Sequence, residues 1–143
     1  MIPNPLDCIL SCFSQNFELT HSMINFLDLK RGSILYDKVM QIWKNYYEIP
    51  KRIIFEIKYE NLINDFEKNT KELLLFLNLK WNKKILTFYK TANNRDRIRT
   101  PSYQQVNKPI YKTSKFKWKN YKKHLEEIRP QIEKWIRYYN YDN

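Results

Sequence analysis

The sequence predicts an α/β domain that is mostly helical and contains one strand buried on both faces. A chain of 143 residues with 43% apolar and 16% aromatic residues is long enough for one domain with a core. Several stretches repeat apolar residues at helical spacing, whereas one short β-branched run, at 53–57, does not alternate with polar residues. We therefore expect residues 1–143 to form a single domain.

The first predicted helix covers 5–16. Asn4 is a suitable N-cap residue, and Pro5 fits the first helical position. The apolar residues that follow at helical spacing are Leu6, Ile9, Leu10, Phe13 and Phe17. A second amphipathic helix is predicted at 33–47, before Pro50. The apolar face of this helix presents Ile34, Val39, Ile42, Trp43 and Tyr46.

The run at 53–57 has the composition of a strand in a parallel sheet with both faces covered. Its β-branched and aromatic residues are Ile53, Ile54, Phe55 and Ile57. Tyr59 follows directly after the carboxyl end of this run. Ligands of open α/β sheets bind outside the carboxyl ends of strands, so Tyr59 is a candidate binding residue.

Helices follow at 62–66 and 70–79, and the apolar run at 73–77 predicts that the second of them is buried. Asn78 tolerates the left-handed conformation that ends many helices. A further short helix is predicted at 84–91.

The segment 92–118 has no periodicity and is rich in Lys, Arg, Ser, Thr, Gln and Tyr, which is typical of an ordered binding loop or a linker. Pro101 and Pro109 interrupt it. Helical spacing resumes at 118–125, and a last helix at 128–139 is expected to pack its apolar face on the domain.

Positive charge is concentrated in one segment. The chain has a net charge of +11, but residues 80–123 alone contain fourteen Lys or Arg and one acidic residue, Asp96. This asymmetry indicates an anionic partner. One interpretation is a nucleic-acid or polyanion surface, with lysines on phosphates and aromatic residues stacking on bases. Aromatic residues that interleave with the basic residues of this segment include Tyr89, Tyr103, Tyr111, Phe116, Trp118 and Tyr121.

Composition excludes several classes of site. The single glycine, Gly32, excludes a glycine-rich phosphate loop within these residues. Cys8 and Cys12 share a helical face at a spacing unsuited to a relaxed disulfide, so we expect reduced core cysteines. His21 and His124 lack metal-ligand spacing, and no metal site is predicted. No apolar run approaches the ~20 residues of a membrane span, and no signal-peptide pattern is present. We therefore expect a cytoplasmic location.

Four motifs occur in order: PLDCILSCF at 5–13, KYENL at 58–62, LFLNLKW at 75–81 and SYQQVNKPIY at 102–111, with Lys-Trp at 117–118. The first resembles the R-x-P-x-D-x-x-x-S helix of the sulfotransferases, which use 3′-phosphoadenosine 5′-phosphosulfate (PAPS). The second and third are similar to that family's (R/K)-Y-E-x-L and F-L-G-L-x-W segments. The fourth looks like the cofactor loop of the tyrosylprotein-sulfotransferase branch, which includes bacterial relatives with tetratricopeptide repeats.

This resemblance covers only the C-terminal half of the family and implies part of its P-loop-nucleotide-kinase-like fold, with the cofactor loop at about 92–118. It implies that Ser11 and Lys117 contact cofactor phosphate, that Gln15 lies nearby and that Tyr59 lines the adenosine site. Ser102 matches a serine near the transferring sulfuryl group, so Ser102 and Lys117 are the candidate catalytic residues. The implied cofactor-binding residues are Ser11, Gln15, Tyr59, Ser102, Tyr103, Gln104, Gln105, Val106, Asn107, Lys108, Pro109, Ile110, Tyr111 and Lys117.

The chemistry of sulfuryl transfer also favours Ser102 and Lys117 as candidate catalytic residues. It is an in-line displacement that spreads charge over the sulfonyl oxygens and the leaving phosphate, so it depends on fixed donors and cations. The basic segment supplies a potential that suits the several negative charges of PAPS.

The sequence also departs from the family. Pro3 stands where the family has an arginine that bonds the 3′-phosphate. No segment matches the family's phosphosulfate loop or its general base. We therefore interpret the chain as a fragment, a split gene product or a degenerate copy that does not catalyse transfer alone.

The sequence leaves open the protein partner, the acceptor and the choice between two non-catalytic functions. An unpartnered strand with its helices exposes apolar surface, which predicts a complementary N-terminal half or a homo-oligomer. The acceptor is a hydroxyl of unknown type, because peptide tyrosine, carbohydrate and small alcohols all fit. A non-catalytic sulfotransferase-like interaction module is a further alternative to the polyanion-binding module, and neither nucleic acid nor a membrane is the expected partner.

Overall fold

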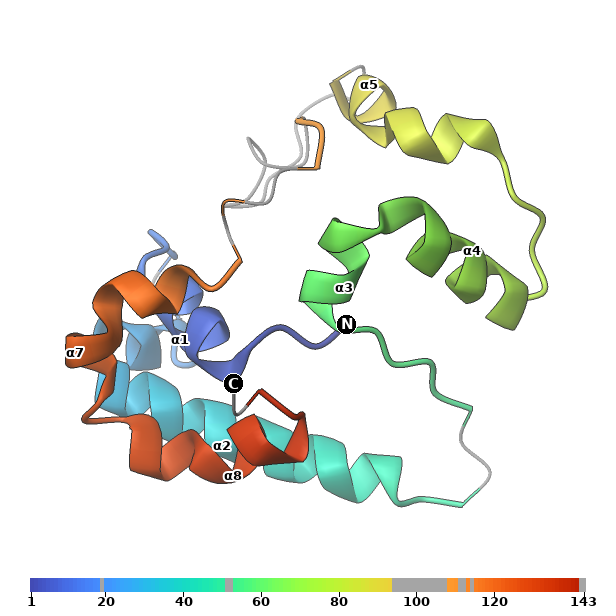
Figure 1. Ribbon diagram of the computed structural model, residues 1–143. Helices are drawn as coiled ribbons and strands as arrows, with labels where there is room; N and C mark the ends of the chain where they lie inside the picture. The colour runs from blue at the N-terminus through green and yellow to red at the C-terminus, as the bar shows by residue number, and fades with distance from the viewer. Residues whose placement is uncertain (19, 51–52, 94–107, 111–112, 114, 142–143) are drawn as a thin grey trace. The chain divides into compact units, whose positions relative to one another are not determined.

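Helices account for the regular structure of the computed structural model, and no strand occurs within the residues that the structure describes. Those residues are 1–18, 20–50, 53–93, 108–110, 113 and 115–141. They divide into a larger unit, Pro3–Ile54 with Lys115–Asn143, and a smaller unit, Met1–Ile2 with Phe55–Ser114 (Figure 1). The mostly helical character agrees with the sequence prediction, and the expectation of a single domain stays a prediction.

The larger unit is built from helices at the two ends of the chain. α2 and α8 lie side by side, and α1 contacts both (Figure 1). The elements of this unit are α1 (Pro5–Phe13), the 3-10 helix η1 (Met23–Leu27), α2 (Leu29–Tyr47), the 3-10 helix η3 (Lys117–Tyr121), α7 (Lys122–Leu125) and α8 (Arg129–Tyr138). Burial of apolar side chains holds these distant segments together. The most deeply buried of them are Leu6, Ile9, Leu125, Ile128, Ile132 and Ile136.

α1 begins where the sequence predicts. Asn4 is buried, and its side-chain oxygen accepts a hydrogen bond from the backbone N–H of Leu6 at 2.9 Å, while Pro5 occupies the first turn. α1 ends at Phe13, earlier than predicted, and at this end the Ser14 hydroxyl and backbone N–H both donate to the Leu10 carbonyl, at 2.8 and 3.0 Å.

Loss of the Asn4 cap is expected to destabilise the larger unit. Asn4→Ala removes the bond to the Leu6 N–H, and we expect the free energy of unfolding to fall by about 1 kcal/mol in urea denaturation. Asn45→Ala is the matched control, because Asn45 is exposed inside α2 and alanine favours helix there. Equal destabilisation by both changes would show that the Asn4 cap contributes nothing specific.

α2 buries a different face from the one predicted. It begins at Leu29, before the predicted start at 33, because the Asp28 carboxylate caps it by accepting from the Arg31 N–H at 2.8 Å. The buried residues of α2 are Gly32, Ser33 and Asp37. The apolar residues expected to face a core are exposed instead, by 37% to 57% of their surface: Ile34, Val39, Ile42, Trp43 and Tyr46.

The Asp37 carboxylate joins α2 to α8. Its Oδ1 accepts hydrogen bonds from Trp135 Nε1 and Lys134 Nζ, both at 2.7 Å. Its Oδ2 accepts from Gln41 Nε2 and Gln131 Nε2, both at 2.9 Å. Burial alone raises the pKa of a carboxyl, but here the bonds from Lys134, Trp135 and Gln41 together hold the pKa of Asp37 below its ordinary value. A buried charge with this many donors is satisfied, and it fixes one helix against the other.

The smaller unit consists of short helices. They are α3 (Tyr59–Asn64), α4 (Phe66–Phe76), the 3-10 helix η2 (Lys83–Thr87) and α5 (Phe88–Asn93). The Asp65 carboxylate caps α4 by accepting from the Lys68 N–H at 3.1 Å. Asn78 has φ 54°, so the predicted left-handed position after this helix is confirmed.

The predicted strand at 53–57 is not a strand in the structure. A single parallel bridge joins Ile2 to Lys58, in which Ile2 N–H donates to Ile57 O at 2.8 Å and Tyr59 N–H donates to Ile2 O at 2.9 Å. Ile53 is 84% exposed, so burial on both faces is not observed either. A strand of that kind needs pairing strands along its length and helices over both faces, and the described residues supply only this one bridge.

The run at 73–77 is also not buried as predicted. Leu75 is 80% exposed, and Leu77 is exposed as well. Five apolar residues in succession surround a helix on every side, whereas only part of that circumference packs within the described residues, through contacts such as the Phe55–Phe76 ring pair at 5.1 Å. No helix in the described part of the chain has the length and apolar character needed to cross a membrane.

Candidate functional site

A hydrogen bond between distant segments forms the centre of the candidate site. The Asp7 carboxylate, in the first turn of α1, accepts from the backbone N–H of Trp118 at 2.7 Å. These residues come from two of the four sequence motifs and lie 111 positions apart. A hydrogen bond to a charged group is stronger than a neutral one, so it attaches the start of η3 to α1. Lys117, the first residue of η3, is thereby placed in the same unit as Ser11 of α1.

The backbone before Lys117 is strained. Phe116 has φ 54° and ψ 29°, a left-handed conformation that is uncommon for a bulky residue and costs about 1 kcal/mol or more. The ammonium groups of Lys115 and Lys119 lie 5.5 and 5.0 Å from the centre of the Phe116 ring. These cation–π contacts support the conformation. Backbone strain of this kind occurs often at functional sites, and here it directly precedes a candidate catalytic lysine.

Three of the predicted site residues belong to the larger unit. Ser11 is exposed on α1, Gln15 is half-buried just after it, and Lys117 is exposed. The Gln15 backbone N–H donates to the Cys12 carbonyl at 3.2 Å, which continues the helical turn. A hydroxyl and an ammonium group that face solvent are accessible to an anionic ligand, and both are suitable partners for phosphate oxygen.

Four predicted site residues belong to the smaller unit. Tyr59 is half-buried at the start of α3, while Lys108 and Pro109 are exposed and Ile110 is half-buried. The remaining predicted residues lie outside the described residues: Ser102, Tyr103, Gln104, Gln105, Val106, Asn107 and Tyr111. The candidate catalytic Ser102 and most of the predicted cofactor loop are therefore not part of the site described here.

The thiols of α1 lie beside Ser11 in the sequence and interact with each other. Cys8 and Cys12 are free, as predicted, but they are half-buried and not in the core. A hydrogen bond from Cys8 lowers the pKa of Cys12 to about 7, while the same bond and burial raise the pKa of Cys8. No cluster of three or more candidate metal ligands occurs in the described segments.

Asp7 is the residue of this arrangement that sequence reasoning did not select. The motif places it three residues into α1, where an acidic side chain is common because it stabilises the positive end of the helix dipole. Because helix-dipole stabilisation already accounts for an acid at this position, the local sequence does not indicate that Asp7 accepts a hydrogen bond from Trp118. The available signal was that Asp7 and Trp118 both lie within the segments that resemble the family.

Comparison with known proteins identifies a family and a relative of this chain. The model of the sulfotransferase family matches residues 1–83, which contain Ser11, Gln15 and Tyr59 but not the predicted cofactor loop or Lys117. An uncharacterized protein of Aquifex aeolicus (strain VF5) is 32% identical over 126 residues, which are 87% of this chain. The chain spans only 16% of the length of that relative. No solved structure matches the chain.

Proposed function

Because this chain belongs to the sulfotransferase family, we propose that it forms the nucleotide-binding part of a PAPS-dependent enzyme of the tyrosylprotein-sulfotransferase-like branch. In the complete enzyme the sulfuryl group of PAPS passes to a hydroxyl acceptor. Family membership rests on the match to residues 1–83. The donor, the branch and the residue roles are our proposals, and the geometry at α1 and η3 supports them.

The observation that carries the proposal is the bond from the Trp118 N–H to Asp7. It connects a helix with a serine on its surface to a segment that begins with an exposed lysine. The two side chains offer a neutral donor and a cation, which is the donor set that binds a phosphate group without metal or covalent chemistry. We assign Ser11 and Lys117 to the phosphate of the nucleotide, and the family resemblance alone assigns Tyr59 to its adenosine.

The proposed roles follow from the charge distribution of the reaction. PAPS supplies an activated sulfuryl group on a phosphate leaving group. A fixed ammonium group such as Lys117 stabilises the negative charge on phosphate more strongly as that charge grows, which lowers the barrier. We propose that Ser102 acts as a further donor near the sulfuryl group. We assign no general base to these residues, so the chain has a binding and charge-stabilising role.

Binding of 3′,5′-adenosine bisphosphate, the desulfated nucleotide, tests this proposal. Isothermal titration of the purified chain is expected to show saturable binding with one nucleotide per chain. Lys117→Ala is expected to weaken that binding about 10- to 100-fold, because a charge-assisted hydrogen bond contributes about 1.5–3 kcal/mol. Lys123→Ala is the matched control, since Lys123 is an exposed lysine a few residues further along, on α7. It removes the same charge and is expected to leave binding unchanged.

Two results would contradict the proposal. Equal losses from Lys117→Ala and Lys123→Ala would indicate a diffuse basic surface and not a nucleotide site. Absence of nucleotide binding by a folded chain, together with salt-sensitive binding of single-stranded DNA, would favour a polyanion-binding module.

A further inference from the structure

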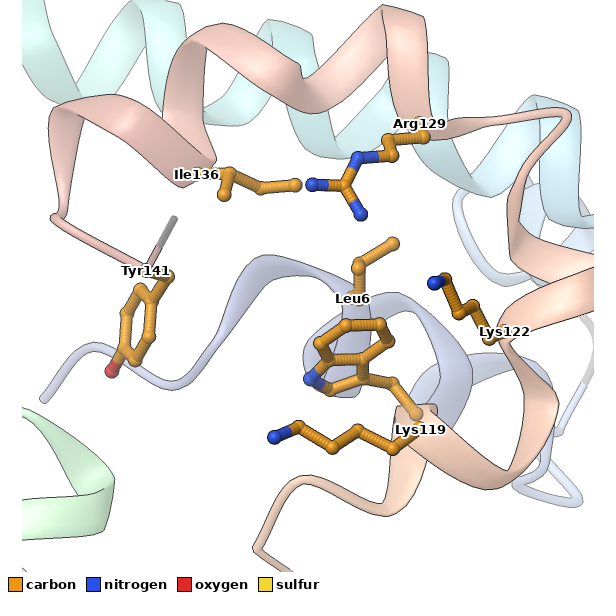
Figure 2. Close-up of a pocket in the computed structure, with 7 residues that line it drawn as sticks. Leu6, Lys119, Lys122, Arg129, Ile136 and Tyr141 are labelled. Atoms are coloured by element: carbon orange, nitrogen blue, oxygen red, sulfur yellow. The ribbon is translucent and has the colours of Figure 1, made fainter. Parts of the chain in front are cut away.

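A pocket lies within the larger unit, and Trp118, the neighbour of Lys117, is one of its lining residues. Its volume is about 340 Å³, at the lower end of the range for small-molecule sites. None of its lining residues is among the predicted cofactor residues. They are Leu6, Trp118, Lys119, Lys122, Arg129, Ile136 and Tyr141 (Figure 2).

Three of the described residues that line this pocket are cations, and none of them is acidic. Lys119 and Lys122 form no ion pair with any acid in the described part of the chain. Arg129 pairs with Glu133 through Nε at 3.1 Å, which leaves its two terminal nitrogens facing elsewhere. Figure 2 shows the Arg129 guanidinium group between Ile136 and Leu6, with the Lys122 side chain extending toward the same space. Among the described residues, Lys119 and Lys122 therefore have no acidic partner, whereas Arg129 has one.

A buried donor of this pocket also lacks a partner. Trp118 is only 9% exposed, and its indole Nε1 is buried without a hydrogen-bond acceptor among the described residues. Buried polar groups in folded proteins are nearly always paired, because an unpaired one keeps its full desolvation penalty. An indole N–H can only donate, so the missing partner is an acceptor. Trp118 therefore lines the pocket with a buried donor that no described residue accepts from.

The rest of the lining determines what kind of anion fits. Leu6 and Ile136 are buried apolar residues, and Tyr141 and Trp118 add aromatic surface. A bare inorganic ion leaves this apolar surface without a contact. We propose that the pocket binds a small organic ester of phosphate or sulfate, with the anionic group on the three cations and with a compact apolar body against Leu6 and Ile136. This inference does not depend on the proposed nucleotide site.

The indole N–H of Trp118 provides a direct measurement. The chain has four tryptophans, so a ¹⁵N–¹H correlation spectrum of the labelled chain contains four indole signals, and Trp118→Phe identifies one of them. Phenyl phosphate and phenyl sulfate are titrated separately, with inorganic phosphate and phenol as comparisons. We expect the Trp118 signal to move saturably with at least one ester, at lower concentration than with inorganic phosphate or phenol.

A matched pair of lysine variants tests the geometry. Lys122→Gln is expected to weaken ester binding about tenfold, whereas Lys123→Gln, on the same helix but outside the pocket lining, is expected to leave it unchanged. The proposal is overturned if neither ester moves the Trp118 signal, or if both variants weaken binding equally. It is also overturned if 3′,5′-adenosine bisphosphate displaces the ester competitively, because the pocket then belongs to the nucleotide site.

Discussion

Replacement of Asp37 by alanine is expected to lower the free energy of unfolding of the chain by about 3 kcal/mol, measured by urea denaturation at pH 7. Asp37 is 4% exposed and accepts from four side chains, three of which lie on α8. Without the carboxylate, the Trp135 indole N–H loses its acceptor in a buried position, which is the costly part of the change. Lys134 is half-exposed and regains water, so it contributes less.

A surface ion pair on the same helix provides the control. Glu48 pairs with Lys44 at 3.8 Å, and both side chains are largely exposed. Glu48→Ala is expected to change the free energy of unfolding by less than about 1 kcal/mol, because solvent screens such a pair. If Asp37→Ala is no more destabilising than Glu48→Ala, the carboxylate does not join the two helices as described.

The effect of Asp37 is expected to depend on pH. Its pKa in the folded chain lies below the usual 3.8, so the unfolded chain binds a proton at higher pH than the folded chain does. The stabilisation is therefore complete above about pH 4 and is lost as the pH falls through the lower, folded value. The difference between wild type and Asp37→Ala should shrink below pH 4. A difference that stays constant from pH 7 to pH 3 would contradict this assignment.

The second large effect concerns Asp7 as a positioning residue. Asp7→Ala is expected to weaken 3′,5′-adenosine bisphosphate binding about 10- to 100-fold, although Asp7 itself is not assigned to the nucleotide. The bond to the Trp118 N–H is worth about 1.5–3 kcal/mol, and its loss frees the segment that presents Lys117. Amide hydrogen exchange of Trp118 should become faster in the same variant, and Asp7→Asn, which keeps an acceptor oxygen, should restore part of the affinity.

Asp28→Ala separates this effect from general destabilisation. Asp28 also accepts a backbone hydrogen bond, from the Arg31 N–H at 2.8 Å, but it caps α2 and has no link to η3. Its loss is expected to cost about 1 kcal/mol of stability and to leave nucleotide binding unchanged. If both variants weaken binding to the same degree, the contribution of Asp7 is stability alone.

Local chemistry explains which parts of the fold the sequence predicted well. Asn4 and Pro5 mark the start of α1, and Asn78 marks the left-handed residue after α4, because each depends only on its own backbone and near neighbours. The last helix, predicted at 128–139, is confirmed at Arg129–Tyr138, since its strong apolar periodicity coincides with its buried face. In these places the local pattern and the packing agree.

Contacts between residues distant in sequence explain which predictions from the sequence were wrong. Periodicity assigned Ile42 and Trp43 to the core, but the buried face of α2 is the one that carries Asp37, because its donors come from α8. In the candidate site, too, local motifs indicated some residues, and a contact between distant segments determined another. Motifs selected Ser11 and Lys117, whereas the hydrogen bond that attaches their segments runs from the Trp118 N–H to Asp7, across 111 residues.

The three bonds from α8 to Asp37 also fix the register of α2 against α8. Sliding one helix along the other by a single turn, about 5.4 Å, breaks the bonds from Gln131, Lys134 and Trp135 together, and no intermediate position keeps some of them at full strength. The helix pair therefore has one alignment and not a continuous range. α8 also carries Arg129 and Ile136, which line the pocket at Trp118. The position of this part of the pocket is therefore fixed in the ligand-free chain.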